Sequence, residues 1–306
     1  MANLIKDSFL QELESRFGKL RRLENSHSLF GVGKSETRIY IRYSKKHSRN
    51  QMFYGLREID LQMLGGYPSV LCFLWDGQLN PLIIPYSEYE EVFHSVSPAT
   101  DGQYKVQIYE QHEGTELYIA NAGRFNVESY FGWQALENLI DLSTSYIPDL
   151  SHSQVQTLLG AIGSHKGFDV WVPINDRSKL DWSFADTYQT NNILPPNLEQ
   201  IVRIVEGVDV IWIERGAGIA KAFFEVEHST SIYSGLLRFN DIHLVLPNLR
   251  TRFSVVSNDD RRSLFVRQLN RPTFKISGLS EICTFLEYGN VFMWHNRIKM
   301  KEGNFR

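Results

Sequence analysis

The stretch "AFFEVEHSTSIYSGLLRFND", Ala222–Asp241, decides the fold of the second half of this 306-residue chain. Its first residues are apolar, as in a β-strand beside a core, and the later ones have the spacing of a helix. Side chains alternate across a strand, so Glu225 and Glu227 leave one face of it. Phe224 and Val226 leave the other face. Carboxylates are costly beside an apolar core unless something positive is held there, so the stretch predicts a strand that delivers two acids to a binding site.

The preceding strand carries a third acid. The segment "VDVIWIE", residues 208–214, is followed by the short turn "RGAG", so the two strands are predicted to form a hairpin in which Asp209 can approach Glu225. Three carboxylates on one small surface raise one another's pKa unless a cation neutralises them. Hard oxygen ligands of this kind suit Mg²⁺ or Mn²⁺. The alternative is a solvated hairpin face on which the acids simply meet water.

The hairpin and the segments around it resemble the PD-(D/E)xK nuclease superfamily of restriction-type endonucleases. In that pattern an Asp ends one strand and (D/E)-x-K follows on its neighbour; here Asp209 takes the first place, and "FEVE" supplies Glu225 and Glu227. Residues 148–275 also look like a group of bacterial proteins suspected to be restriction nucleases. The resemblance implies Mg²⁺-dependent hydrolysis of phosphodiester bonds in double-stranded DNA by a restriction or phage-defence enzyme. Because both strands must be cut with one site per chain, it also favours a homodimer.

By this resemblance Asp209, Glu225 and Glu227 are the catalytic residues and the ligands of Mg²⁺, for which Mn²⁺ can substitute, helped by the Val226 carbonyl. The chain departs from the pattern at two places. No proline precedes Asp209, and Glu227 occupies the place where the family usually has lysine. A lysine would polarise the attacking water, whereas a glutamate could bind a second metal or accept the proton of the water.

Several further candidates lie close to these acids in the sequence, and each also has an ordinary structural explanation. They are Gln154, Gln156, Asp176, Lys221, His228 and Arg238. The glutamines belong to the first helix of this half and could hold water, or be solvated. The aspartate follows a strand, where sites are common, but it could instead cap a turn. The histidine could tune the site, or have only a structural role. The lysine and the arginine could supply the missing positive charge, or lie on the surface.

The length predicts two domains, and 42% hydrophobic with 22% charged residues is typical of globular chains. The boundary is placed in "TSYIPDLSHS", residues 144–153, because of its proline and small polar residues. Residues 1–146 are predicted to be a β-rich DNA-recognition domain and residues 147–306 a restriction-endonuclease-like catalytic domain. The order helix, strand, hairpin, helix, strand, helix in the second half predicts an α/β arrangement with a mixed central sheet, so the fold class is α+β or α/β.

The first domain is predicted to choose where the second one acts. Its strand rhythm suggests a small β-barrel, with "FYGLREIDLQMLGG", residues 53–66, as a short helix. Basic and aromatic side chains that could grip phosphates or approach bases are Arg42, Tyr43, Lys45, Lys46, Arg49 and Arg57. Phe53 lies among them in the sequence, and for this residue a place in the core is the favoured interpretation.

Charge is distributed unevenly along the chain, although the formal net charge is only −3. Residues 1–50 hold 11 Lys or Arg against 5 Asp or Glu, and residues 250–275 hold 7 against 2. Charge runs are usually solvated surface, which is the alternative for either stretch alone. Two basic stretches around an acidic site suit a polyanion whose cleavage needs a cation.

Several other classes of protein are excluded or disfavoured by the sequence. No apolar run approaches the ~20 residues of a membrane span. The N-terminus reads as an amphipathic helix and not a signal peptide, and Cys72 and Cys283 are expected to be buried free thiols in a reducing cytoplasm. "FGVGKSE" lacks the first glycine of a phosphate-binding loop, and the nine histidines show no H-E-x-x-H or paired zinc spacing.

A function from another class stays open. The missing lysine is also compatible with a non-catalytic DNA-binding protein on a degenerate nuclease scaffold. Such a protein would bind DNA in a salt-sensitive way and take up no metal.

Overall fold

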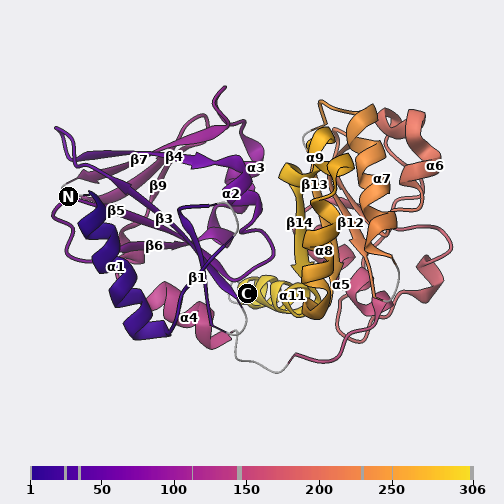
Figure 1. Ribbon diagram of the computed structural model, residues 1–306, viewed down its shortest axis with the longest axis horizontal. Coiled ribbons are helices and arrows are strands. Elements are labelled where there is room, and N and C mark those ends of the chain that lie inside the picture. The colour runs from indigo at the N-terminus through magenta and orange to yellow at the C-terminus, as the bar shows by residue number, and fades with distance from the viewer. Residues whose placement is uncertain are drawn as a thin grey trace. The chain divides into compact units, whose positions relative to one another are not determined.

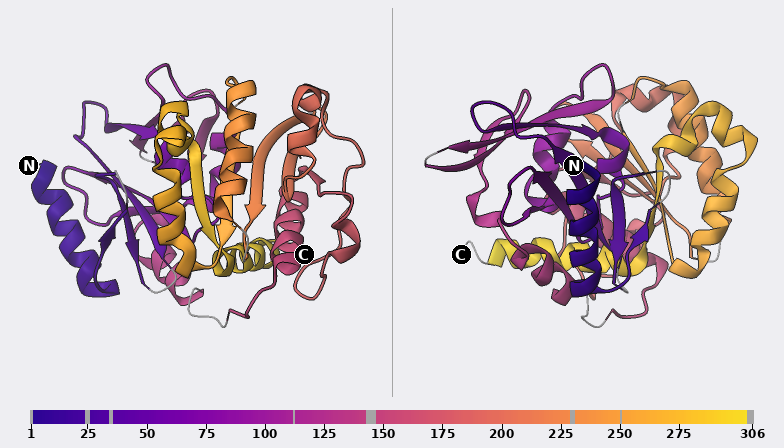
Figure 2. Two further views of the ribbon diagram at one scale, coloured as in Figure 1. Left: turned by 45° about the vertical axis from the view of Figure 1, so that its right-hand side comes forward. Right: turned by 60° about the vertical axis from the view of Figure 1, so that its left-hand side comes forward.

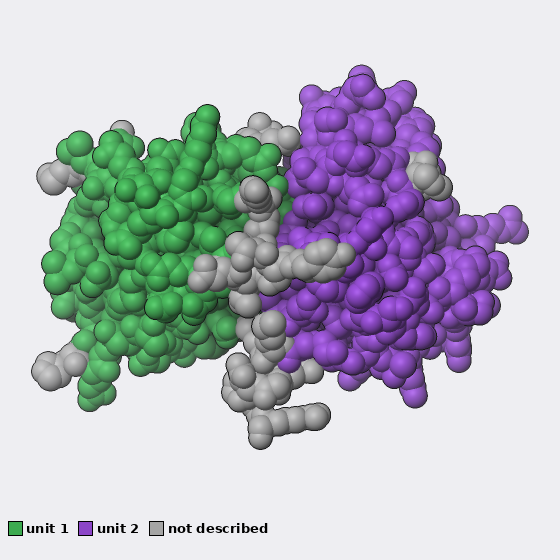
Figure 3. All heavy atoms as spheres, turned by 90° about the horizontal axis from the view of Figure 1, so that it is seen from below, with its two compact units in different colours: residues 1–145 green, residues 146–306 purple. Residues whose placement is uncertain are grey.

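The computed structural model describes residues 2–23, 26–33, 36–111, 113–142, 147–228, 231–249 and 251–303. The chain divides into two compact units, residues 1–145 and 146–306, which Figure 3 draws in two colours. Residues 143–146, where the predicted boundary segment begins, lie outside the described residues. Both units combine helices with sheets, and the predicted fold class, α+β with a mixed central sheet in the second half, is confirmed (Figure 1).

The described strands of the first unit form two sheets and not the small barrel that the strand rhythm suggested. The first sheet has the order β1 (Arg21–Arg22), β2 (Leu29–Val32), β3 (Thr37–Ser44), β5 (Ser69–Trp75) and β6 (Leu82–Pro85). The second has the order β4 (Gln51–Arg57), β7 (Gln103–Gln111), β8 (Gly114–Ile119) and β9 (Gly123–Asn126). Neighbouring strands are antiparallel, apart from the parallel pair of β3 and β5.

Alternation along β3 explains why the first sheet has a core on each face. Ile39 and Ile41 belong to the apolar cluster that includes α1 (Ala2–Phe17) and α4 (Gln134–Leu142). Tyr40, between them, belongs to the cluster shared with the second sheet. The short elements of this unit are α2 (Glu58–Gln62), η1 (Tyr86–Glu88), α3 (Glu90–Ser95) and η2 (Glu128–Tyr130).

The helix predicted over residues 53–66 is wrong for its first part. Met52, Tyr54 and Leu56 are buried at every second position, so the segment up to Arg57 is strand β4 and only Glu58–Gln62 is helical. Phe53 points the other way and is 47% exposed, which contradicts its expected place in the core.

The second unit is built on one mixed sheet. Its order is β10 (Asp169–Trp171), β11 (Val210–Glu214), β12 (Ile219–Val226), β13 (Arg252–Ser257) and β14 (Cys283–Glu287). The predicted hairpin is confirmed, because β11 and β12 pair antiparallel, as do β10 and β11. β12, β13 and β14 run parallel, which requires a crossover between each pair. The strand β14 lies in the apolar tail, where the sequence pattern had not separated a strand from a helix.

Helices cover both faces of this sheet (Figures 1 and 2). The crossovers are α7 (Ile232–Val245) and the series α8 (Arg262–Leu269), α9 (Pro272–Ser277) and α10 (Leu279–Ile282), and α7 contacts each helix of this series. α5 (His152–His165) packs against α11 (Tyr288–Gly303), and α5 also contacts β10, β11 and β12. The remaining elements are η3 (Arg177–Lys179), η4 (Pro196–Ile201), α6 (Val202–Val205) and η5 (Asp259–Arg261). None of the described helices is long and apolar enough to cross a membrane.

Helix α5 lies unusually close to strand β11. The Trp212 indole Nε1 donates a hydrogen bond of 2.9 Å to the Leu159 carbonyl, in the middle of the helix. A Cβ atom at Gly163, one turn further on, would lie 2.4 Å from the same Nε1. The helix can therefore rest on the indole only because residue 163 has no side chain.

We expect Gly163→Ala to destabilise the second unit. Overpacking of a well-packed core costs about 1–3 kcal/mol. The better helix propensity of alanine offsets at most about 1 kcal/mol of this. Thermal unfolding followed by circular dichroism should show a lower midpoint for this variant, and the neighbouring Ser164→Ala serves as the control. An unchanged midpoint for Gly163→Ala would contradict the close packing of α5 on Trp212.

Candidate active site

The hairpin brings Asp209 beside Glu225, as the sequence predicted. Val210 pairs with Phe224 in the antiparallel ladder, so Asp209, one residue earlier, reaches the position opposite Glu225. The backbone N–H of Val226 donates a hydrogen bond of 2.7 Å to Asp209 Oδ2. The Asp209 carboxylate is therefore fixed across the end of the hairpin.

Glu225 and Glu227 are buried against helix α7, with 3% and 4% of their surfaces exposed. A Cβ atom at Gly235 of this helix would lie 3.0 Å from Glu227 Oε1 and 3.2 Å from Glu225 Cβ. The glycine thus leaves room for both acids under α7. Asp209, Glu225 and Glu227, which we call the acid cluster, do not lie on a solvated face of the hairpin, so that alternative is wrong.

Burial and mutual repulsion make the carboxylates reluctant to ionise. Burial raises the pKa of Asp209 to about 7, although the Val226 N–H and the charge of Arg238 oppose this shift. Burial, and next the charge of Asp209, raise the pKa of Glu225 to about 8, again against Arg238. Groups that lose hydration and face like charges favour the neutral form. The charge of Arg238 is therefore not enough to hold both Asp209 and Glu225 ionised.

Arg238 is a member of this site, although a surface position was the favoured interpretation. Its Nη1 donates to Glu225 Oε1 in a close ion pair, and its side chain is 30% exposed. Arg238 follows Gly235 by three residues on α7, so the helix turns both toward the same strand. Lys221, the other candidate for the missing positive charge, pairs instead with Glu214 at 3.1 Å and takes no part in the cluster.

The two candidate glutamines of α5 support the backbone. Gln156 is buried, and its Nε2 donates 3.0 Å to the Asp209 carbonyl, so it positions the strand that carries the acid. Gln154 completes a capping box with Ser151 at the start of α5. Neither of these contacts is with a carboxylate of the acid cluster.

Asp176 and His228 lie at the margin of the site. Asp176 pairs with Lys179 at 2.7 Å, and its charge contributes to the raised pKa of Asp209. His228 is exposed, and its ring stacks on Tyr288 with centroids 6.0 Å apart. Asp176 therefore acts on Asp209 through its charge, and His228 packs on the Tyr288 ring.

The sequence did not single out His152 or Tyr288. His152 Nε2 lies 3.6 Å from Asp209 Oδ1, and burial lowers the pKa of this imidazole. Tyr288 Oη is buried with no hydrogen-bond partner among the described residues, and burial, with the charges of Asp209 and Glu227, raises the pKa of the phenol. The capping box at Ser151 could have placed His152 at the start of the helix, but no local pattern links Tyr288 to the acids.

The candidate DNA-binding residues of the first unit differ in how much they are engaged. Arg57 forms an ion pair of 2.7 Å with Asp60, and Lys46 one of 2.6 Å with Glu110. Other intramolecular contacts are a 2.7 Å hydrogen bond from Tyr43 Oη to Asp76 and the approach of Arg42 to within 6.0 Å of the Tyr40 ring centre. Lys45 and Arg49 are exposed and have no ion-pair partner among the described residues.

We expect the metal-free protein to lose stability as the pH rises from about 6.5 to about 8, above the range in which the lowered pKa values of the buried His152 and His295 oppose this trend. In this window the folded chain keeps protons on Asp209 and Glu225 that the unfolded chain has released, so the free energy of unfolding falls with pH. Urea titrations in chelator at fixed ionic strength measure this slope. Glu225→Gln should flatten it, while Glu214→Gln on the exposed end of the hairpin should leave it unchanged. Equal slopes for the wild type and Glu225→Gln would show that Glu225 is ordinarily ionised.

Comparison with known proteins identifies a family for the second unit, which contains the acid cluster. A family model described as the Type II restriction enzyme NmeDI C-terminal domain matches residues 141–302. The Type II restriction enzyme NmeDI of Neisseria meningitidis serogroup C is 32% identical over 133 residues, which are 40% of this chain and 37% of that protein. The match thus spans little more than a third of the relative's length, and no solved structure matches the chain significantly. Since the family model covers more than half of the sequence, the chain belongs to the family of the Type II restriction enzyme NmeDI C-terminal domain.

Proposed function

We propose that this protein is a Mg²⁺-dependent restriction endonuclease that hydrolyses phosphodiester bonds of double-stranded DNA. The observation that carries the proposal is the pair of buried carboxylates, Asp209 and Glu225, whose pKa values are raised to about 7 and about 8. Shifted carboxylates in one place are typical of functional sites. They lie in the segment that matches a restriction enzyme domain.

The donor set fits a hard divalent cation. Asp209, Glu225 and Glu227 offer carboxylate oxygens, which Mg²⁺ and Mn²⁺ prefer, and the raised pKa values of Asp209 and Glu225 indicate that their negative charge is not fully compensated. When bound, Mg²⁺ supplies Lewis-acid stabilisation of the charge that develops on the phosphoryl oxygens. The chain contributes orientation, since the Val226 N–H and the Gln156 amide fix Asp209 from two sides.

Glu227 and Arg238 together take the place of the family's lysine in this proposal. A guanidinium stays charged at all relevant pH values, so Arg238 can offset Glu225 and contact a phosphate but cannot move protons. A carboxylate can accept a proton from an attacking water. Glu227, on the same face of the strand as Glu225, is the residue placed for that task, or for a second metal ion.

The first unit is proposed to hold the DNA. The exposed cations Lys45 and Arg49 lie between β3 and β4, where the Phe53 ring, 47% exposed, contacts His47 edge-on at 5.2 Å. In this arrangement the cations can contact the phosphate backbone of DNA, and the exposed aromatic ring can approach a base. We further propose that two copies of the chain, each with one site, cut the two strands of DNA as a homodimer in the cytoplasm.

We expect the purified protein to cut duplex DNA with Mg²⁺, and Glu225→Gln or Asp209→Asn to reduce the rate by more than about 100-fold. Changes to residues behind a metal ligand already cost about 10–100-fold, so the loss of a ligand should cost more. Glu214→Gln, on the same hairpin, is the matched control. Digests of methylated and unmethylated genomic DNA, with fragment ends sequenced, measure activity and site together.

Cleavage by Glu225→Gln at the wild-type rate would remove the acid cluster from the mechanism. The rival function, a non-catalytic DNA-binding protein, predicts salt-sensitive binding without cleavage and, in calorimetry, no heat of Mn²⁺ binding that Glu225→Gln removes. The ion pair of Arg238 with Glu225 is the observation that favours this rival, because it supplies part of the positive charge without a metal.

We also expect the double change Lys45→Gln and Arg49→Gln to reduce the salt dependence of DNA binding. Each lost phosphate contact lowers the slope of log K against log salt by about 0.9. Fluorescence anisotropy at several salt concentrations measures the slope. Lys46→Gln, which breaks an internal pair with Glu110, should change it less. If the double variant keeps the wild-type slope, DNA does not contact this turn.

A further inference from the structure

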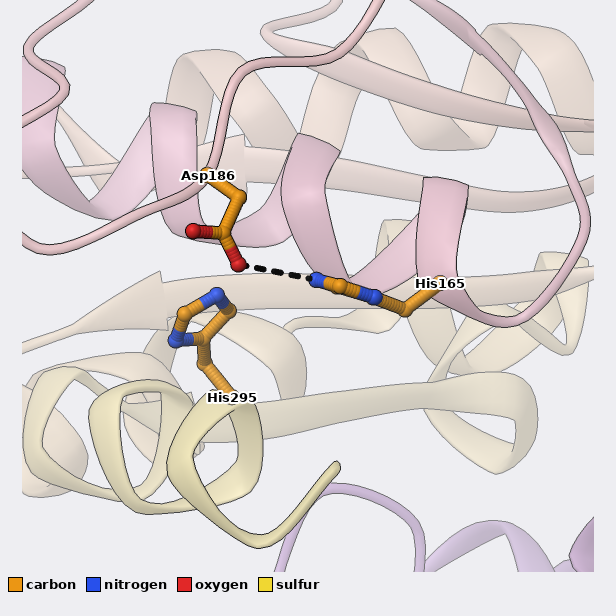
Figure 4. Close-up of side chains that lie close together, drawn as sticks. All are labelled: His165, Asp186 and His295. Atoms are coloured by element: carbon orange, nitrogen blue, oxygen red, sulfur yellow. Dashed lines mark ion pairs between the residues drawn. The ribbon is translucent and has the colours of Figure 1, made fainter. Parts of the chain in front are cut away.

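A second group of titratable side chains lies in the same unit, away from the acid cluster. We call His165, Asp186 and His295 the histidine cluster; their nitrogen and oxygen ligand atoms all lie within 4.8 Å of one another. Figure 4 shows both rings turned toward the Asp186 carboxylate. His152, beside Asp209, begins α5 and His165 ends it, so at 1.5 Å per residue about 20 Å separates the two groups.

The environment of His295 is a second, independent indication that the histidine cluster binds a ligand. The residue is completely buried in α11, and neither ring nitrogen forms a well-aligned hydrogen bond within the described residues, although the neighbouring Asn296 side chain interacts with the ring. Buried polar groups are almost always satisfied, so an imidazole without a well-aligned hydrogen bond at either nitrogen needs an explanation. Burial, and next the charge of Lys299, lower the pKa of His295 to about 4. The ring is therefore neutral at pH 7 and has a lone pair to offer.

An aromatic contact beside the histidine cluster holds Asp186 and His295 close together. The ring of Phe184 contacts the ring of Phe292 edge-on, with centroids 5.6 Å apart. Asp186 follows the first ring by two residues in its segment, and His295 follows the second by three residues on the helix. The aromatic contact thus holds the two ligands against each other without any ion. His165 reaches the same point from α5, with its Nε2 3.6 Å from Asp186 Oδ2.

Lys299 pairs with the Asp186 carboxylate and would compete with a bound metal ion for it. Its Nζ lies 3.0 Å from both carboxylate oxygens, and it follows His295 by four residues on α11. The lysine side chain is 44% exposed and Asp186 is 53% exposed. A long exposed ammonium can turn into water when a stronger cation arrives, so the ion pair does not close the site.

We propose that His165, Asp186 and His295 bind a divalent transition-metal ion, with Zn²⁺ as the ion that fits best. Two imidazoles and one carboxylate are a common ligand set of zinc, whereas Mg²⁺ prefers oxygen atoms alone. Tetrahedral bonds of about 2.0–2.1 Å need ligand atoms about 3.3 Å apart, which side-chain rotations of the present cluster can reach. The exposed side of Asp186 leaves the fourth position to water.

Such an ion would tie the irregular segment between β10 and β11 to the two helices on one face of the sheet. Asp186 belongs to that segment, while His165 and His295 belong to α5 and α11. The ligands are far apart in the sequence, so no spacing motif of paired histidines announces them. The role inferred is structural, because nothing in the cluster is shared with the acids at the other end of α5.

Uptake of Zn²⁺ and Co²⁺ by the full chain tests the proposal. We expect one equivalent of metal to bind at the histidine cluster, with the visible absorption of four-coordinate Co²⁺ and displacement of Co²⁺ by Zn²⁺ but not by Mg²⁺. Asp186→Asn, at a half-exposed position that tolerates the change, and His165→Asn should each weaken binding more than about tenfold. Lys299→Gln should bind at least as tightly as the wild type. His94→Asn, an exposed histidine outside the cluster, is the matched control.

Two results would overturn the proposal. The first is Co²⁺ binding that Asp186→Asn and His165→Asn leave unchanged. The second is binding that disappears in Glu225→Gln, which would assign the ion to the acid cluster instead. Because the readout is metal uptake and not DNA cleavage, a protein without nuclease activity can still confirm the site, and an active nuclease can still lack it.

Discussion

The register of the β11–β12 hairpin places Asp209 opposite Glu225, and the N–H of Val226 holds the Asp209 carboxylate in that position. A slip of one residue would send Glu225 and Glu227 to the face of α5 and bring Phe224 under α7. The register at the turn after Glu214, continued unchanged, would place Asp209 opposite Phe224. The irregularity between Trp212 and Ile213 shifts the pairing by one residue, and this shift brings Asp209 opposite Glu225. The geometry of the acid cluster is thus a consequence of strand pairing and not of attraction among its members, which repel one another.

Helix α7 turns that pairing into an enclosed site. Because Gly235 has no side chain, the helix lies directly over Glu225 and Glu227, and three residues later Arg238 supplies one positive charge. Enclosure takes the carboxylates out of water, and this loss of hydration is the main reason why the pKa values of Asp209 and Glu225 rise; the charge of Asp209 adds to the rise at Glu225. The same enclosure would make a single bound cation strongly stabilising.

Much of the second unit was predictable because its pattern is local. The apolar strands of the hairpin, the glycine turn between them and the helix after Glu227 are visible in consecutive residues. The pairing of Asp209 with Glu225 also depends on the register shift between Trp212 and Ile213, which no local pattern announces. The part played by Arg238 was not visible, because a cation on an amphipathic helix usually lies in water. His152 and Tyr288 come from segments far from the hairpin, and only tertiary packing brings them there.

The first unit shows the opposite case. Strand β4 was assigned to a helix because its polar and apolar residues satisfy either period over a few positions, and the pairing with β7 decided the outcome. Two separate sheets and one barrel can have the same sequence of strands and turns. The order of the strands along the chain does not specify which strands pair. The exposed Phe53 follows from the same error, because its face is known only when the strand is known.

The contact between the Trp212 indole and the Leu159 carbonyl lies midway along α5, with His152 at one end of the helix and His165 at the other. Because α5 also packs against α11 and contacts β10 and β12, the helix is held as one rigid element. The residue beside Asp209 and the residue beside Asp186 are therefore mechanically linked, and a displacement of one end of α5 would displace the other end as well.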